Sequence, residues 1–129
     1  MTQTLAPILT SIGQLEIRVG NLEEARTFYE FTLGVEVESM FGQTMMLRCG
    51  ELSILVQEAK EQPIGCPIYF RVDGRVHEVA AQLKANGVRF KSGPSCIVED
   101  FMGKSSWLAF FADPWGNPLA LMGDMPVED

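Results

Sequence analysis

The stretch QLEIRVGNLEEARTFYEFTLGVEVE, residues 14–38, aligns without gaps on PIYFRVDGRVHEVAAQLKANGVRFK, residues 67–91. The offset is 53 residues throughout. Four aligned pairs are identical: Arg18 with Arg71, Val19 with Val72, Gly34 with Gly87, and Val35 with Val88. A repeat at a fixed offset indicates two copies of one supersecondary unit. The order of structural signals within each copy predicts a strand, a helix and a second strand.

Each copy opens with alternating polar and apolar residues, the pattern of a strand with one buried face. A turn follows at residues 20–21 or 73–74, and a helical pattern begins. One apolar helix face is formed in each copy, by Leu22, Ala25, Tyr29 and Leu33 in the first and by Val76, Val79, Ala80 and Leu83 in the second. Each helix is predicted to end at a glycine, Gly34 or Gly87, because glycine readily adopts the left-handed conformation of a C-terminal cap.

The rest of each copy is rich in strand signals. We expect strands at 45–49 and 52–57, joined by a tight hairpin at Gly50 and Glu51, and at 107–111 and 119–122. The sequence DPWGN, residues 113–117, is typical of a turn. Residues 60–65 are predicted to link the copies, and residues 91–103 to form a loop with a short strand inside it.

Length and composition favour a single domain. The chain has 129 residues, of which 47% are hydrophobic, enough for a proper core. We therefore expect one domain, with its first module at about residues 12–59 and its second at about 65–124. No stretch has the roughly 18 apolar residues of a membrane span, and the N-terminal MTQTLAPILTSIG lacks a basic start before an apolar run. A cytoplasmic location without membrane contact is the expectation.

Charge and cysteine content exclude several classes of protein. The formal net charge is −7 with no basic run, which would repel a phosphate backbone, so nucleic acid is not an expected partner. The acidic surface either favours a cationic ligand or only maintains solubility. Cys49, Cys66 and Cys96 are an odd number without CxxC spacing, so we expect buried thiols rather than disulfides or a zinc site.

Two motifs carry a resemblance to a known family. VGNLEEARTFY, residues 19–29, with Leu33 and Gly34 after it, and DPWGNPLAL, residues 113–121, resemble the two signatures of the vicinal oxygen chelate superfamily of glyoxalases, bleomycin-resistance proteins and extradiol dioxygenases. The resemblance implies an α+β fold of two βαβββ modules, which form a cupped, barrel-like mixed sheet with the helices outside. The fold hosts many reactions, so it does not identify one.

The resemblance also implies where a divalent metal would be held, near the start of each module's first strand and in its last strand. These positions carry Gln14 and Pro67 on the first strands and Ala120 on the last strand of the second module. The fourth position, on the last strand of the first module, falls at or next to Ser53. Proline and alanine have no side-chain donor, and glutamine is a weak neutral ligand. We therefore expect no metal and no other cofactor. The single histidine, His77, is expected to be solvent-exposed on its helix and unable to reach the cup.

Strand alternation places the mixed polar faces toward the cup and the apolar faces under the helices. The predicted ligand-binding residues are Gln14, Glu16, Arg18, Arg48, Ser53, Tyr69, Arg71, Trp107 and Met122. Two accounts of the charges stay open: Glu16 pairs with Arg71 as a structural ion pair, or an arginine orients an anionic group of a ligand. Glu16, if desolvated, is also the one weak candidate for a catalytic base.

The sequence favours a metal-free small-molecule-binding protein of the glyoxalase and bleomycin-resistance type, which sequesters or carries an aromatic or partly cationic compound. The enzyme alternative is a lyase, isomerase or dioxygenase acting on a small oxygenated substrate, with a displaced metal site or none. A third alternative is a regulatory or structural dimer whose cup is filled by its own side chains. Because a chain this short leaves sheet edges open, and by resemblance to the family, we expect a homodimer.

Overall fold

The structure, a computed structural model, describes residues 6–7, 9–61 and 65–126. The first module contains, in chain order, β1 (Gln14–Val19), α1 (Leu22–Arg26), η1 (Thr27–Thr32), β2 (Glu36–Phe41), β3 (Thr44–Cys49) and β4 (Leu52–Glu58). Its four strands form one sheet in the order β1-β4-β3-β2, in which only the β1–β4 pair is parallel.

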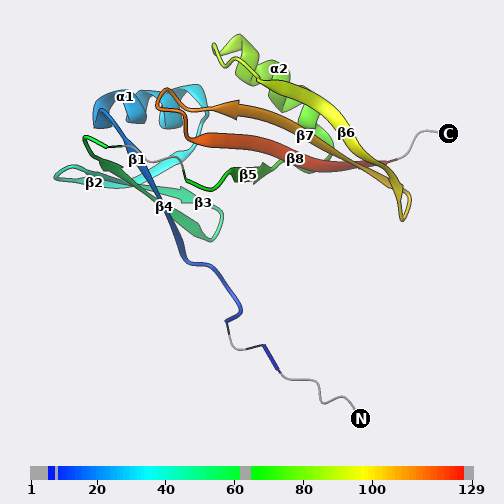
Figure 1. Ribbon diagram of the computed structural model, residues 1–129, viewed down its shortest axis with the longest axis horizontal. Helices are drawn as coiled ribbons and strands as arrows, with labels where there is room; N and C mark the ends of the chain where they lie inside the picture. The colour runs from blue at the N-terminus through cyan, green and yellow to red at the C-terminus, as the bar shows by residue number, and fades with distance from the viewer. Residues whose placement is uncertain (1–5, 8, 62–64, 127–129) are drawn as a thin grey trace.

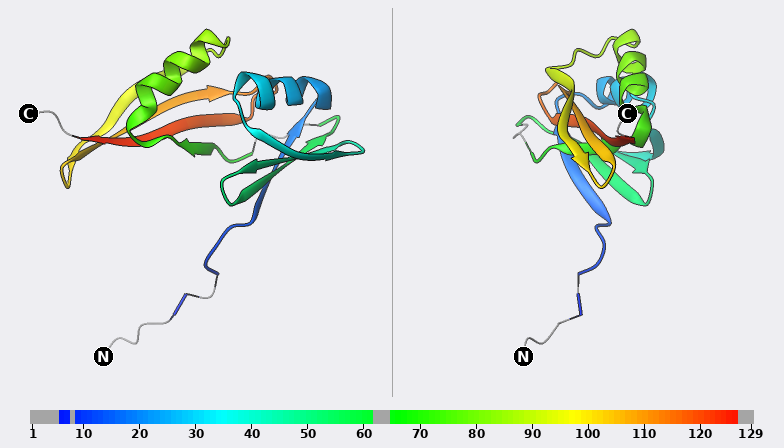
Figure 2. Two further views of the ribbon diagram at one scale, coloured as in Figure 1. Left: turned by 180° about the vertical axis from the view of Figure 1, so that it is seen from behind. Right: turned by 90° about the vertical axis from the view of Figure 1, so that its right-hand side faces the viewer.

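The second module repeats this topology. It contains β5 (Ile68–Arg71), the short 3₁₀ helix η2 (Asp73–Arg75), α2 (Val76–Ala85), β6 (Ser92–Phe101), β7 (Lys104–Ala112) and β8 (Pro118–Pro126). The sheet order β5-β8-β7-β6 matches that of the first module strand for strand. Both helices lie on the same side of the two sheets, whose other faces are left open (Figure 1 and Figure 2). The expected α+β fold of two βαβββ modules is confirmed, as an open cup of two sheets rather than a closed barrel.

Strand alternation produces the expected two faces in both modules. In β1, Ile17 and Val19 are buried while Glu16 and Arg18 are exposed. The four strand residues of β5 alternate in the same way between half-buried and exposed. Because β1 buries its apolar residues beneath α1, its polar residues must line the open face.

Both helices end just before the glycines that were predicted to terminate them, Gly34 and Gly87. Asn21 caps α1 by accepting a hydrogen bond from the backbone N–H of Glu24 at 2.9 Å, and the helix then widens into the π-helix η1. Gly34 and Gly87 follow the two helices with φ of 76° and 98°, values that glycine adopts without the strain that a Cβ would add.

One element departs from the expectation. Residues 91–103 do not form a loop around a short strand, because β6 is a ten-residue strand paired with β7. Its pairing register shifts three times, between Ser92 and Ser95, Cys96 and Val98, and Val98 and Phe101. These irregularities break the two-residue alternation by which a strand is recognised in sequence. Of the expected linker at 60–65, residues 62–64 lie outside the described residues.

A buried polar network joins the two modules. The hydroxyl of Tyr29, which is 0% exposed, donates to Oδ2 of Asp113 at 2.9 Å. The Asn117 amide donates to the same oxygen at 2.7 Å and to the backbone carbonyl of Arg18, in β1, at 2.9 Å. Oδ1 of Asp113 accepts from the backbone N–H groups of Trp115 and Asn117. The two family-like motifs thus meet each other, and together with a hydrophobic core shared by both modules they fix the modules' relative placement.

The three cysteines are free thiols, but the expectation that they are buried is wrong. Cys49 and Cys66 are exposed and Cys96 is half-buried. Cys49 ends β3 and Cys66 precedes β5, so both lie at strand termini rather than in the core. No helix in the described part of the chain has the length and apolar character needed to cross a bilayer.

Candidate functional site

The positions at which the resemblance implies metal ligands are divided between the two modules. Gln14 on β1 is the register partner of Ser53 on β4, so the two side chains are neighbours. Ala120 on β8 pairs with Tyr69, two residues after Pro67, which immediately precedes β5. Two of the four positions therefore lie in each module, and only Gln14 and Ser53 are register partners.

These residues do not fit a divalent metal. Ala120 is 0% exposed and, like Pro67, has no side-chain donor, while Gln14 and Ser53 offer only neutral oxygens. Among the described residues, no group of three or more His, Cys, Asp or Glu side chains is placed to hold a metal ion. The donor chemistry at these positions does not fit the metal centre that the resemblance implies.

The open face of the first sheet carries most of the predicted site residues. Gln14, Ser53 and Arg48 form one row across β1, β4 and β3, since each is in register with the next. Glu16 lies in the following row beside Leu55 and Met46. Arg18 stands two residues further along β1. This face is therefore mixed, with charges set among apolar side chains.

The open face of the second sheet carries a second group. Tyr69 and Arg71 alternate with the apolar residues of β5, and Met122 is the register partner of Arg71. The ring of Tyr69, 45% exposed, lies edge-on to Phe110 with the centroids 6.0 Å apart. Both groups of predicted residues thus face away from the helices, on separate sheets.

The ion pairs differ from the one expected. Glu16 does not pair with Arg71: its carboxylate lies 3.4 Å from Nε of Arg18, two residues along the same strand. Arg71 lies 3.6 Å from Asp73, and Arg48 lies 3.1 Å from Glu38. Local spacing explains the Glu16–Arg18 pair, because residues i and i+2 of a strand share a face, whereas Asp73 lies in η2, just after β5 ends at Arg71. Glu16 has 43% of its side chain exposed.

Trp107 does not join the predicted site. It pairs with Gly123 and Cys96, which places it on the helix side of the second sheet, opposite to Tyr69 and Arg71. Its ring lies edge-on to His77 of α2 with the centroids 4.6 Å apart, and its Nε1 donates to the Ser105 hydroxyl at 2.9 Å. His77 is exposed, as expected, although its ring packs on Trp107.

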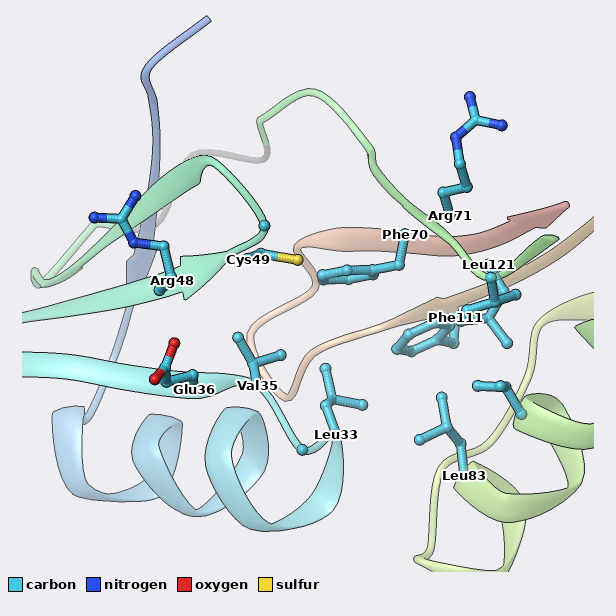
Figure 3. Close-up of a pocket in the computed structure, with 14 residues that line it drawn as sticks. Leu33, Val35, Glu36, Arg48, Cys49, Phe70, Arg71, Leu83, Phe111 and Leu121 are labelled. Atoms are coloured by element: carbon cyan, nitrogen blue, oxygen red, sulfur yellow. The ribbon is translucent and has the colours of Figure 1, made fainter. Parts of the chain in front are cut away.

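A pocket of about 400 Å³ lies between the two modules, which we call the seam pocket. Its lining is predominantly apolar and comes from the end of η1, the β3–β4 hairpin, β5, α2 and β7–β8, the principal residues being Leu33, Val35, Phe70, Val79, Leu83, Phe111 and Leu121. Figure 3 shows Arg48 and Arg71 on opposite sides of this pocket, with Cys49 and Phe70 between them. Partial burial raises the pKa of the Cys49 thiol, so this group stays protonated at neutral pH.

Only Arg48 and Arg71 of the predicted site residues line the seam pocket. The apolar lining was missed because Leu33, Phe70 and Leu83 follow the same periodicity as core residues. That they belong to different modules was visible in the sequence, but the packing of one module against the other was not.

Comparison with known proteins identifies relatives by family and by fold. The model of the family described as the Glyoxalase/Bleomycin resistance protein/Dioxygenase superfamily matches residues 11–121. The chain matches no curated protein sequence.

Three solved structures illustrate the structural likeness. An integron cassette protein from the mobile metagenome of a Halifax Harbour sewage outfall is 25% identical, with a TM-score of 0.74 over 89% of this chain and 99% of the other. A glyoxalase/bleomycin resistance protein/dioxygenase from Nocardioides is 15% identical, with a TM-score of 0.73 over 94% and 87%. Lactoylglutathione lyase from Agrobacterium tumefaciens is 19% identical, with a TM-score of 0.70 over 88% and 90%. The last two likenesses establish the fold alone.

Proposed function

The chain belongs to the glyoxalase/bleomycin resistance protein/dioxygenase superfamily, and we propose that it is a metal-free small-molecule-binding protein that sequesters or carries an aromatic or partly cationic compound. The observation that carries this proposal is the seam pocket. Its volume of about 400 Å³ lies in the range of ligand pockets, roughly 300 to 1,000 Å³, and its lining is mainly apolar with few charged groups, as such pockets usually are.

Binding is favoured over catalysis by the chemistry of the side chains. The superfamily's metal positions offer no adequate donor set, and Glu16 is solvent-exposed and paired with Arg18. A metal-dependent lyase, isomerase or dioxygenase would need charged or imidazole donors at those positions, and among the described residues they carry none. A binding protein needs only shape and apolar contact.

The ligand contacts are proposed in two sets. The aromatic part of the ligand is assigned to the seam pocket, where the half-buried ring of Phe70 is available for stacking. The partly cationic character rests on the net charge of −7 and on Glu16 at the open face. The remaining contacts are proposed for Gln14, Arg18, Arg48, Ser53, Tyr69, Arg71 and Met122. Trp107 lies on the other face of its sheet and would serve a separate site.

We also propose that the protein is a cytoplasmic homodimer with one domain of two modules, at about residues 12–59 and 65–124. Within the described chain each sheet has two edge strands whose outer edges are unpaired, β1 and β2 in one sheet and β5 and β6 in the other. Unpaired edges and open faces favour association with a second copy.

A thermal-shift screen of small aromatic compounds tests the binding function, because a ligand that binds only the folded state raises the melting temperature. Val79→Phe fills the seam pocket from α2 and should abolish the shift. Val98→Phe, an equal change at a valine on β6 that is 42% exposed, is the matched control and should retain it. Absence of any concentration-dependent shift across the screen, or an equal shift in Val79→Phe, would refute binding in the seam pocket.

A further inference from the structure

A second pocket lies on the helix-side face of the second sheet, apart from the seam pocket. The strands β6, β7 and β8 extend beyond the start of α2, so the helix leaves the far end of this face uncovered (Figure 1 and Figure 2). The pocket has a volume of about 540 Å³, within the usual size range of ligand sites, and we call it the Trp107 pocket. The start of α2 and the three strands line it, chiefly with His77, Glu99, Ser105, Trp107 and Met125.

The indole of Trp107 is held in place by its neighbours. Its Nε1 donates to the Ser105 hydroxyl at 2.9 Å, and this hydroxyl donates in turn to the backbone carbonyl of Met125 at 3.3 Å. The ring of His77 lies edge-on to the indole with the centroids 4.6 Å apart. Trp107 is half-buried, so part of its ring stays open to the pocket. Because the indole N–H is already paired, what Trp107 offers a ligand is its π surface.

The fixed charge of the Trp107 pocket is negative. Glu99 is the one carboxylate among the described residues that line it, and no lysine or arginine is among them. Glu99 follows Val98, the register partner of Ser106 on β7. By alternation it stands beside Ser105, two residues from Trp107, on the helix side of the sheet. Diagonal neighbours on adjacent strands have Cβ atoms roughly 7 Å apart, so one small cation can contact both the indole and the carboxylate.

These features favour a quaternary ammonium group over other ligands. Tryptophan binds cations through its ring better than the other aromatic residues, and the attraction is larger when the cation is desolvated. A quaternary ammonium has no N–H donor, so it needs no acceptor in a pocket where the Ser105 hydroxyl is already engaged. The half-buried thioether of Met125 adds polarisable surface for the N-methyl groups.

We propose that the Trp107 pocket is a second binding site, which takes a small quaternary ammonium compound with its methyl groups against the indole of Trp107 and its charge toward Glu99. The Trp107 pocket and the seam pocket share no lining residue among those described. The site is therefore independent of the function proposed for the seam pocket.

The experiment titrates isotope-labelled protein with choline and with neohexyl alcohol, the neutral isostere in which a carbon atom replaces the ammonium nitrogen. The indole N–H resonance of Trp107 reports on the pocket, and that of Trp115, the other tryptophan, is the internal reference. Choline should shift the Trp107 resonance to saturation and bind about fivefold more tightly than the alcohol, the ratio expected for a cation–π contact at a partly exposed site. The Trp115 resonance should not move.

Glu99→Gln keeps the shape of the pocket and should weaken choline binding by about two- to fivefold, the range of an exposed ion pair, without changing binding of the alcohol. Asp124→Asn is the matched control. Asp124 is also exposed, but it lies on the open face of the same sheet, where it accepts from the Ser106 hydroxyl at 2.9 Å, so its loss should leave choline binding unchanged. Trp107→Leu should abolish choline binding in titration calorimetry, with far-UV circular dichroism to verify that each variant is folded.

Each of the contrary results would overturn the proposal. Equal affinities for choline and the alcohol would overturn the assignment of a cation. Equal weakening by Glu99→Gln and Asp124→Asn would show that only the net charge of the protein attracts choline. Choline binding that survives Trp107→Leu in the folded protein, or the absence of a saturable shift at Trp107, would show that the pocket is not the site. None of these results bears on the seam pocket, which Val79→Phe tests.

Discussion

Tyr29 and Asp113 are 84 residues apart in the chain, yet their side chains form one buried hydrogen bond. Burial, reinforced by the negative charge of Asp113 and the hydrogen bond to it, raises the pKa of Tyr29 well above its ordinary value. The phenol therefore remains a donor throughout the physiological range. Tyr29 acts as a clamp between modules rather than as an acid or base.

Replacing Tyr29 with phenylalanine should lower the free energy of unfolding by about 1 to 2 kcal/mol, since Asp113 loses one buried donor. The other tyrosine, Tyr69, is 45% exposed, so Tyr69→Phe is the matched control and should change stability by less than about 0.5 kcal/mol. Urea unfolding measures both. Equal effects of the two substitutions would contradict the clamp.

The same bond predicts a pH dependence. Above pH about 10 the tyrosine of the unfolded chain loses its proton while buried Tyr29 keeps it, so the unfolded state binds fewer protons and stability falls as pH rises. The part of this fall that belongs to Tyr29 should be missing from Tyr29→Phe. Unfolding curves of the wild type and of Tyr29→Phe at about pH 9 and about pH 11 measure how much stability each protein loses. Equal losses in the two proteins would show that Tyr29 does not cause the pH dependence.

At the scale of elements, the crossover from β5 to α2 passes directly over β8 at Gly123. A Cβ at residue 123 would collide with backbone atoms of Asp73, at the start of η2. Asp73 itself has a φ of 48°, so this turn is held in a conformation that few residues adopt. Gly123 is needed for close backbone approach rather than for a positive φ.

Gly123→Ala should therefore lower the free energy of unfolding by at least about 2 kcal/mol, because the backbone of η2 must move away from β8. Gly74→Ala changes the next residue of the same turn, where a Cβ meets nothing within 4 Å, and should be within about 0.5 kcal/mol of the wild type. Chemical denaturation measures the free energy of unfolding of both variants. A neutral Gly123→Ala would show that the contact is not required.

Most elements were predictable because each carries its own local signal. The alternation of β1 and β5, the apolar helix faces and the terminal glycines Gly34 and Gly87 all follow periodicities of two or 3.6 residues. The length of β6 was not predictable, because its register shifts disrupt the alternation of polar and apolar residues. The joining role of Asp113 and Asn117 was also missed, since a turn motif does not reveal which distant groups its side chains contact.

At the scale of the whole molecule, the repeat explains how two sheets of the same topology come to present their open faces on one side. The faces of Arg18 and Arg71 were predictable from alternation alone. The partners of these arginines were not, because ion pairing depends on distances between strands and turns that the sequence leaves undetermined. The seam pocket was likewise hidden, since its lining consists of residues that look like ordinary core.

Two unpaired edges per sheet lead us to expect a dimer of twice the monomer mass in solution. Exposed apolar side chains on the outer strands support this, including Phe41 on β2 and Ile97 on β6, which are 56% and 57% exposed. Light scattering coupled to size exclusion at micromolar concentration measures the mass. A strictly monomeric protein would rule the dimer out.

The central proposal is that this chain binds a small molecule without a metal, because Pro67 and Ala120 stand where the family resemblance implies metal ligands. The most direct measurement is the affinity, by titration calorimetry, for the aromatic compound that gives the largest thermal shift, using protein freed of its purification tag and dialysed first against EDTA and then against metal-free buffer. The account predicts saturable binding with the same dissociation constant as untreated protein, unchanged when zinc, nickel or manganese is added back. Loss of binding on chelation, restored by one of these ions, would contradict it.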